Sequence, residues 1–280
     1  MLIKTRNMER EDFDFAIDVA DKEGWEYERR DLERLAQVFP DGLLLAEDGN
    51  KRLGWMIACH YGLFMWIGSL VVHSVARRRG VGSALMQRAF KYADENGART
   101  VALYAYQKAI PFYERIGLRR NGEFLLLRGA SEGEKQRAVD LEKPEIDEIL
   151  SLDRKYFRGD RLRLLEALRE EFGQFFLLSK DKKSGYIFGK TYGDGSAEIG
   201  PWVCEPNNRE IAESLLRAIL SRIRSKRISV VVPALNTEAL RILDKFSFKV
   251  QRVSTCMYRG SVEDLPRTDG IYAAAGWDVG

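Results

Sequence analysis

The spacing of apolar positions changes repeatedly along the first half of the chain, and each change predicts an element. Phe13, Ile17 and Ala20 lie at helical spacing, whereas residues 64–72 form a continuous apolar run typical of a strand. The same reasoning predicts strands over residues 2–6, 43–46, 54–60, 64–72, 101–104 and 124–127, and helices over 9–22, 32–39, 81–96 and 110–116. This order predicts a mixed α/β sandwich.

The second half repeats the first with a constant shift. Val72 aligns with Trp202 and Leu118 with Phe248, each 130 residues further on. A small, polar stretch without periodicity lies near residue 130. We therefore expect a domain over residues 1–129, a linker over 130–137 and a second domain of similar fold over 138–280.

Composition narrows the classes of protein. Charged residues make up 31% of the 280 residues, but the net charge is only +3, which disfavours a nucleic-acid binder. The first residues lack the pattern of a signal peptide, and no apolar run reaches the length of a membrane span. Cys59, Cys204 and Cys256 do not have metal-ligand spacing, so we expect reduced thiols and no metal. These features predict a cytoplasmic protein with no membrane partner; they say nothing of its oligomeric state.

One loop carries candidate chemistry, because it follows the strand over 64–72 and opens a helix. The first helical turn has backbone N–H groups without helical acceptors, and glycine lets a ligand's oxygens approach them. Neighbouring guanidinium groups suit a pyrophosphate. An ordinary surface turn with a basic rim is the alternative. The predicted phosphate-binding residues are Arg77, Arg78, Arg79, Gly80, Val81, Gly82 and Ser83.

The loop resembles motif A of the GNAT family of N-acetyltransferases, written Arg/Gln-x-x-Gly-x-Gly/Ala, with Arg77, Gly80 and Gly82 at its fixed positions. A second family signature lies at residues 109–118. The whole chain resembles a tandem GNAT protein with an active first domain and a degenerate second one. The resemblance implies two tandem folds, each a mixed, mostly antiparallel sheet flanked by helices.

The resemblance also implies acetyl-CoA as the acyl donor. Backbone groups of Leu70, Val71 and Val72 would bind its pantetheine and polarise its thioester carbonyl. Tyr113 matches the family's usual general acid, which protonates the leaving thiolate. The alternative for Tyr113 is a half-buried side chain that only packs against the sheet.

The general base and the acceptor wall are less defined. An alkylammonium acceptor must lose a proton, and Glu23, Glu26, Glu28 and His73 are candidates. We favour Glu26, which follows Trp25 in the connection between the first two helices, where the family's acceptor wall lies; Trp25 is the expected acceptor-contacting aromatic. A solvated loop carboxylate is an equally good interpretation of Glu26.

The second repeat has lost the phosphate loop. Asn207 stands at the position of Arg77, and Glu210 at that of Gly80. A glutamate at a helix entry would repel a phosphate. We therefore expect acetyl-CoA to bind only the first half.

These residues favour an N-acetyltransferase that moves an acetyl group to a primary amine, of a small molecule or an amino terminus, by direct attack in a ternary complex. A non-catalytic acyl-CoA-binding regulatory protein is the alternative. Nucleic-acid binding through Arg77, Arg78 and Arg79 fits the near-neutral charge poorly.

Overall fold

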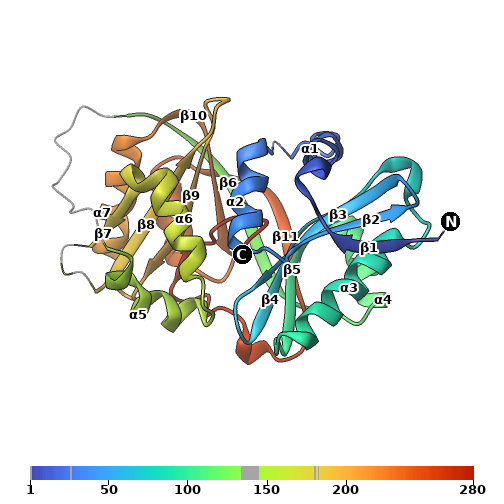
Figure 1. Cartoon of the computed structure of the whole chain (residues 1–280). Helices are drawn as coiled ribbons and strands as arrows, with labels where there is room; N and C mark the ends of the chain where they lie inside the picture. The colour runs from blue at the N-terminus through green and yellow to red at the C-terminus, as the bar shows by residue number, and fades with distance from the viewer. Residues whose placement is uncertain (1, 26, 134–144, 180, 182) are drawn as a thin grey trace.

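The computed structural model describes every residue except 1, 26, 134–144, 180 and 182. Figure 1 shows two lobes of similar construction. The first half contains β1 (Lys4–Asn7), α1 (Phe13–Asp21), α2 (Arg29–Val38), β2 (Leu43–Asp48), β3 (Lys51–His60), β4 (Phe64–Val72), α3 (Val81–Glu95), β5 (Thr100–Ala105), α4 (Ile110–Arg115) and β6 (Arg119–Glu132).

In the residues that the structure describes, the second half repeats this order from α1 onward, without a counterpart of β1, and adds β12 at its end. It contains α5 (Ile146–Phe157), α6 (Leu162–Phe172), β7 (Phe176–Leu178), β8 (Gly185–Thr191), β9 (Ala197–Cys204), α7 (Arg209–Arg222), β10 (Arg224–Pro233), α8 (Thr237–Lys245), β11 (Lys249–Arg259) and β12 (Ile271–Ala273). The predicted element order and the predicted repeat are both confirmed, and β4 has the predicted bounds.

All described strands join one sheet in the order β1-β2-β3-β4-β5-β11-β6-β10-β9-β8-β7, and β12 pairs with β9. Only the pairs β4–β5 and β9–β10 are parallel, so the sheet is mixed and mostly antiparallel, as predicted.

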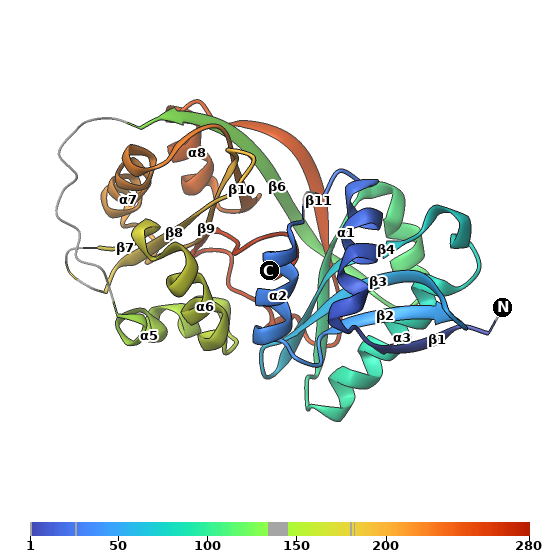
Figure 2. The ribbon, with the colours of Figure 1, turned by 45° about the horizontal axis from the view of Figure 1, so that its top comes forward.

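The two halves exchange their last long strands. β11 of the second half pairs with β5 of the first, with Met257 opposite Leu103. β6 of the first half pairs with β10 of the second, with Leu126 opposite Val231. Both strands cross between the lobes in Figures 1 and 2. Each half therefore depends on a strand from the other.

This exchange explains why β6 is longer than the four residues predicted. β6 has a partner on each side, β11 and β10, and continues to Glu132. The first residues of the expected linker, 130–132, therefore belong to the sheet, while 134–137 lie outside the described residues.

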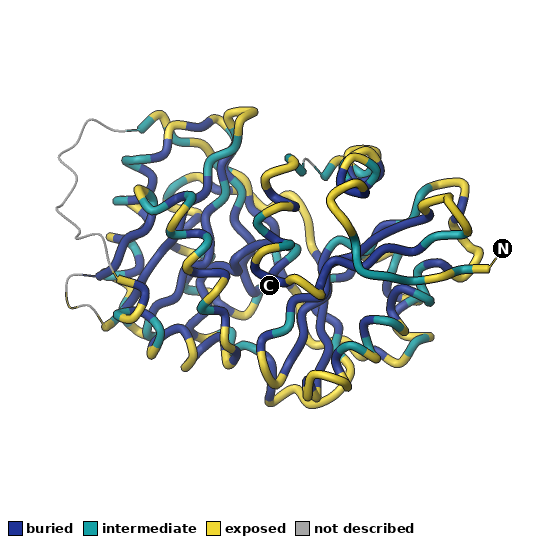
Figure 3. Tube along the Cα trace, in the orientation of Figure 1, coloured by how far each residue is buried: buried dark blue, intermediate teal, exposed yellow. Residues whose placement is uncertain are grey.

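Three apolar cores are built on the sheet, and its strands are mostly buried in Figure 3. One core lies under α3 and α4, with Leu85 and Tyr113. A second lies under α7 and α8, with Leu215 and Leu243. The third is shared by the halves and packs α1 and α2 together with α5 and α6.

The described cysteines are buried and free. No described helix combines the length and the hydropathy needed to cross a membrane. Among the same residues, no three His, Cys, Asp or Glu side chains come together as a metal site would require.

Candidate active site

A β-bulge distorts β4 at Ser69. The pairing with β3 shifts at this residue. Trp55 of β3 lies opposite Val71 of β4. Ile57, two residues after Trp55, lies opposite Gly68, which is three residues before Val71. Ser69 has a positive φ of 50°. Trp66 and Val71, an odd number of residues apart, consequently face the same core. The extra residue turns the following side chains to the opposite face.

β4 and β5 separate just before the bulge at Ser69. Their parallel pairing joins Phe64–Ile67 with Thr100–Leu103 and goes no further. The β5-facing backbone groups of the next β4 residues, including Leu70, Val71 and Val72, therefore lie outside that ladder. This places Leu70, Val71 and Val72 where an extended ligand can form strand-like hydrogen bonds.

The predicted phosphate loop lies between the end of β4 and α3. Gly80 precedes the helix in the left-handed region with φ 86°, and Arg78 also has a positive φ of 62°. The N–H of Ala84 donates to the carbonyl of Gly80 at 2.9 Å. The N–H groups of Val81, Gly82 and Ser83 come before this first helical bond. These N–H groups belong to the first turn of α3, a 15-residue helix, where the helix dipole favours a bound anion.

Gly82 lies beside α4 and the end of β4. A Cβ built on it would lie 3.4 Å from Cζ of Phe112 and 3.9 Å from Cγ2 of Val72, which are ordinary contacts. The protein itself therefore does not require glycine here. A ligand that approaches the backbone from outside would require it.

Arg77 has structural contacts besides its predicted role. Its Nε donates to the carbonyl oxygen of Val72 at 3.0 Å, and its guanidinium pairs with Glu23. It thus joins the end of β4 to the segment after α1. Arg78 and Arg79 are exposed at the loop.

Tyr113 lies on α4 and is 7% exposed. Burial, and then the neighbouring Tyr106, raise the pKa of its phenol. Its ring packs 5.0 Å from that of Phe112, which contacts the Gly82 position. The structure therefore brings α4, the loop and the end of β4 together, with a phenol that stays protonated at neutral pH.

The connection between α1 and α2 covers the opposite face of β4. Trp25 is half-buried and packs at the edge of the shared core, while Glu26 lies outside the described residues. The Tyr27 hydroxyl lies 2.5 Å from Oγ of Ser69 and donates to Oδ2 of Asp278 at 3.1 Å. Burial, and then the charge of Asp278, raise the pKa of the Tyr27 phenol well above its usual value.

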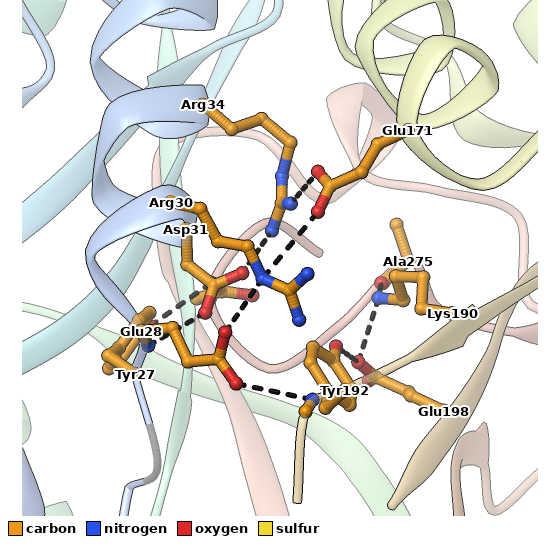
Figure 4. Close-up of polar contacts among 12 residues, drawn as sticks. Tyr27, Glu28, Arg30, Asp31, Arg34, Glu171, Lys190, Tyr192, Glu198 and Ala275 are labelled. Atoms are coloured by element: carbon orange, nitrogen blue, oxygen red, sulfur yellow. Dashed lines mark hydrogen bonds and ion pairs between the residues drawn. The ribbon is translucent and has the colours of Figure 1, made fainter. Parts of the chain in front are cut away.

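Figure 4 shows that the second half supports this connection. Oε1 of Glu28 accepts from the backbone N–H of Gly193 at 3.2 Å. Arg34 of α2 pairs with Glu171 of α6. The candidate acceptor wall is therefore held by residues of both halves.

Sequence reasoning did not single out Asp278. It is 209 residues from Ser69 and belongs to no motif. It reaches β4 only because the segment after β12 returns to the first half.

The equivalent region of the second half is filled by the chain itself. β9 and β10 pair over only three residues, Ala197–Ile199 with Ile228–Val230. Beyond them β12 pairs with β9, and the N–H of Ala274 donates to the carbonyl of Val231 in β10 at 2.9 Å. Glu210 lies in the first turn of α7.

The chain is similar to known proteins in sequence and in fold. A model of the acetyltransferase (GNAT) family matches residues 4–118, and a model of an acetyltransferase (GNAT) domain matches residues 149–273. An uncharacterized N-acetyltransferase of Methanocaldococcus jannaschii is 29% identical over 143 residues, which are 41% of this chain and 62% of that protein. The chain thus spans less than two thirds of that relative.

Two solved structures resemble the whole chain. A candidate acetyltransferase from Pyrococcus horikoshii has a TM-score of 0.84 and 21% identity, with 99% of this chain and 96% of that chain covered. A tandem GNAT protein from the clavulanic acid biosynthesis pathway has a TM-score of 0.63 and 12% identity, with 92% and 98% covered. At these identities the similarity shows a shared fold.

Proposed function

Since the chain belongs to the GNAT family, with one GNAT fold in each half, we propose that it is an acetyl-CoA-dependent N-acetyltransferase with its active site in the first half. The acceptor is a primary amine, of a small molecule or an amino terminus. The observation that carries this proposal is the meeting of three features: the separated ends of β4 and β5, the N–H groups that begin α3, and the buried phenol of Tyr113.

The N–H groups of Val81, Gly82 and Ser83 suit the pyrophosphate of acetyl-CoA, with Arg78 and Arg79 nearby. Backbone groups of Leu70, Val71 and Val72, outside the β4–β5 ladder, suit the pantetheine amides. A backbone N–H at this position can also donate to the thioester oxygen as negative charge develops on it.

Tyr113 supplies a proton on the α3 and α4 side of the sheet. Its burial keeps the phenol protonated, so it can donate a hydrogen bond to the sulfur as the carbon–sulfur bond breaks. Its usual pKa, about 10, already lies above that of a thiol, about 8.5, and burial widens this difference. We therefore infer that stabilisation of the developing thiolate precedes full proton transfer.

The second half is proposed to bind no acetyl-CoA. β12 occupies the space between β9 and β10, and Glu210 places a negative charge in the first turn of α7. The half instead contributes β11 to the active sheet and side chains to the acceptor wall.

The alternative, a non-catalytic acyl-CoA sensor, shares the coenzyme site but has no need of a buried proton donor. Release of free thiol from acetyl-CoA, measured with an alkylamine, a diamine and a peptide amino terminus, separates the two. Amine-dependent release that falls at least about 10-fold in Tyr113→Phe supports the enzyme. Binding of acetyl-CoA without release for any of these amines would favour the sensor.

A further inference from the structure

We propose that Asp278 is the terminal proton acceptor for the acceptor amine, reached through the hydroxyl groups of Ser69 and Tyr27. This inference rests on the proposed acetyltransferase function and assigns its general base.

Asp278 is held in place from both halves. β12 fixes the start of its segment on β9, and the N–H of Ala275 donates to the carbonyl of Gly280 at 2.9 Å. On the first half, the Tyr61 hydroxyl donates to the carbonyl of Val279 at 2.7 Å. The carboxylate therefore has a defined position.

Gly68 of β4 permits this position. A Cβ on Gly68 would lie 2.2 Å from the carbonyl oxygen of Asp278 and 2.6 Å from its Cα. The backbone of Asp278 thus lies directly against β4, one residue before the bulge at Ser69.

The carboxylate of Asp278 has little compensation for its charge. It is half-buried, and its hydrogen bond in the described structure is the one from Tyr27. Among the residues that the structure describes, no lysine or arginine forms an ion pair with it. A partly desolvated carboxylate without a cation is costly unless a ligand supplies the charge, and an alkylammonium would do so.

The hydrogen bonds run in one direction, from the bulge to Asp278. Because Tyr27 donates its proton to Oδ2 of Asp278, Ser69 must donate to the Tyr27 oxygen for both contacts to be satisfied. The Ser69 hydroxyl can therefore accept a proton from the ammonium while it gives its own proton to Tyr27. Tyr27 in turn gives its proton to Asp278.

The acid and the base then lie on opposite faces of β4. Leu70, Val72 and Tyr113 contact the core under α3 and α4, whereas Tyr27 and Trp66 contact the shared core. The amine can attack from one face while the sulfur is protonated on the other.

The proton balance is complete without another reactant. The ammonium gives one proton through Ser69 and Tyr27 to Asp278, from which it passes to solvent. The nitrogen forms a bond to the thioester carbon, and the carbon–sulfur bond breaks. Tyr113 gives its proton to the sulfur, and the second proton lost by the nitrogen restores the phenol. The products are an amide, a thiol and one released proton.

Several groups set the charge around Asp278. Those that interact with it or lie beside its segment are Tyr27, Cys59, Tyr61, Tyr192, Lys190 and Glu198. Lys190 pairs with Glu198 at 2.7 Å and donates to the carbonyl of Ala275 at 2.5 Å, so its charge is engaged.

The test compares Asp278→Asn and Asp278→Glu with the unaltered protein, in kcat and KM for an alkylamine from pH 6 to pH 11. We expect Asp278→Asn to lower kcat about 100-fold near pH 7. The difference in kcat between Asp278→Asn and the unaltered protein should become smaller as pH approaches the pKa of the amine, about 10.4, because the amine then binds already deprotonated. Asp278→Glu should recover part of the loss. Asp269→Asn, which removes an exposed carboxylate paired with Arg267, is the matched control.

Calorimetry with acetyl-CoA on each variant separates loss of the base from loss of the fold, and we expect affinities within about 2-fold of the unaltered protein. Equal pH profiles for Asp278→Asn and the unaltered protein would overturn the assignment and leave the acetyltransferase intact. So would a loss of kcat that is constant across pH. If the unaltered protein acetylates no amine, the proposed function itself fails.

Discussion

The hydroxyl of Tyr27 and the Oγ of Ser69 meet at 2.5 Å, although one residue follows α1 and the other forms the bulge of β4. This contact joins the candidate acceptor wall to the strand that would hold the thioester. It also makes Tyr27 the middle of the path to Asp278.

Tyr27→Phe removes that path while it keeps the ring, which packs edge-on against Trp55 at 5.5 Å. We expect kcat for an alkylamine to fall about 10- to 100-fold, since proton transfer is interrupted. The free energy of unfolding should fall by about 1 kcal/mol, the usual contribution of a hydrogen bond. Steady-state kinetics and chemical denaturation measure the two effects; unchanged kcat would show that the hydroxyl is only structural.

The raised pKa of Tyr113 determines how this residue should affect the pH dependence of activity. Burial raises the pKa of its phenol, so the proton is kept to a higher pH than the usual value, about 10. Activity should therefore show no loss attributable to this residue between pH 7 and pH 10. In Tyr113→Phe the rate should be lower by a constant factor across that range. A basic limb near pH 8 that disappears in Tyr113→Phe would contradict the assignment.

We expect the charge of Asp12 to make the free energy of unfolding depend on pH in the acid range. Burial disfavours its charge, but hydrogen bonds from Arg6, the Glu9 backbone and Arg52 outweigh that effect and lower its pKa to about 2. Because the pKa is lowered, this stabilisation is complete above the unfolded value, about 4, and is lost as pH falls toward 2. Asp12→Asn should therefore unfold more easily than the unaltered protein at pH 7, by about 2 kcal/mol.

Thermal unfolding of both proteins at pH 7, 4 and 2.5 measures the Asp12 effect. The gap in Tm should narrow at the lowest pH. A gap that stays constant with pH would mean that Asn disturbs packing at Asp12 and that charge is not the cause.

The strand exchange predicts cooperative unfolding. β5 lies beside β11, and β6 beside β10, so neither half keeps its sheet when the other unfolds. Urea unfolding followed by tryptophan fluorescence and by far-ultraviolet circular dichroism should give one coincident transition. Two separated transitions would show that the halves are stable independently.

The local elements were predictable because their patterns are uninterrupted. The apolar run of β4 and the helical stripe beginning at Val81 gave the strand, the loop and the helix in the right order. The loop residues could be proposed because glycine and arginine at fixed spacing have a direct physical meaning at a helix start. Tyr113 was proposed from the resemblance of residues 109–118 to a GNAT signature, and the roles of all these residues stay predictions.

The strand exchange could not be predicted, because β6 and β11 are equivalent strands of a repeat. Their patterns fit either neighbouring sheet, and only tertiary packing decides between them. Asp278 could not be singled out for a related reason, since its hydrogen-bond partner Tyr27 is 251 residues away along the chain. The base predicted from sequence, Glu26, lies outside the described residues, and its role stays a prediction.

Calorimetric titration of acetyl-CoA into the unaltered protein and into Gly82→Trp and Glu210→Ala tests the central claim most directly. One site per chain should be filled, Gly82→Trp should weaken binding more than about 100-fold by covering the helix-start amides, and Glu210→Ala should change nothing. Absence of binding, two sites per chain, or unchanged affinity in Gly82→Trp would contradict a single coenzyme site at the start of α3.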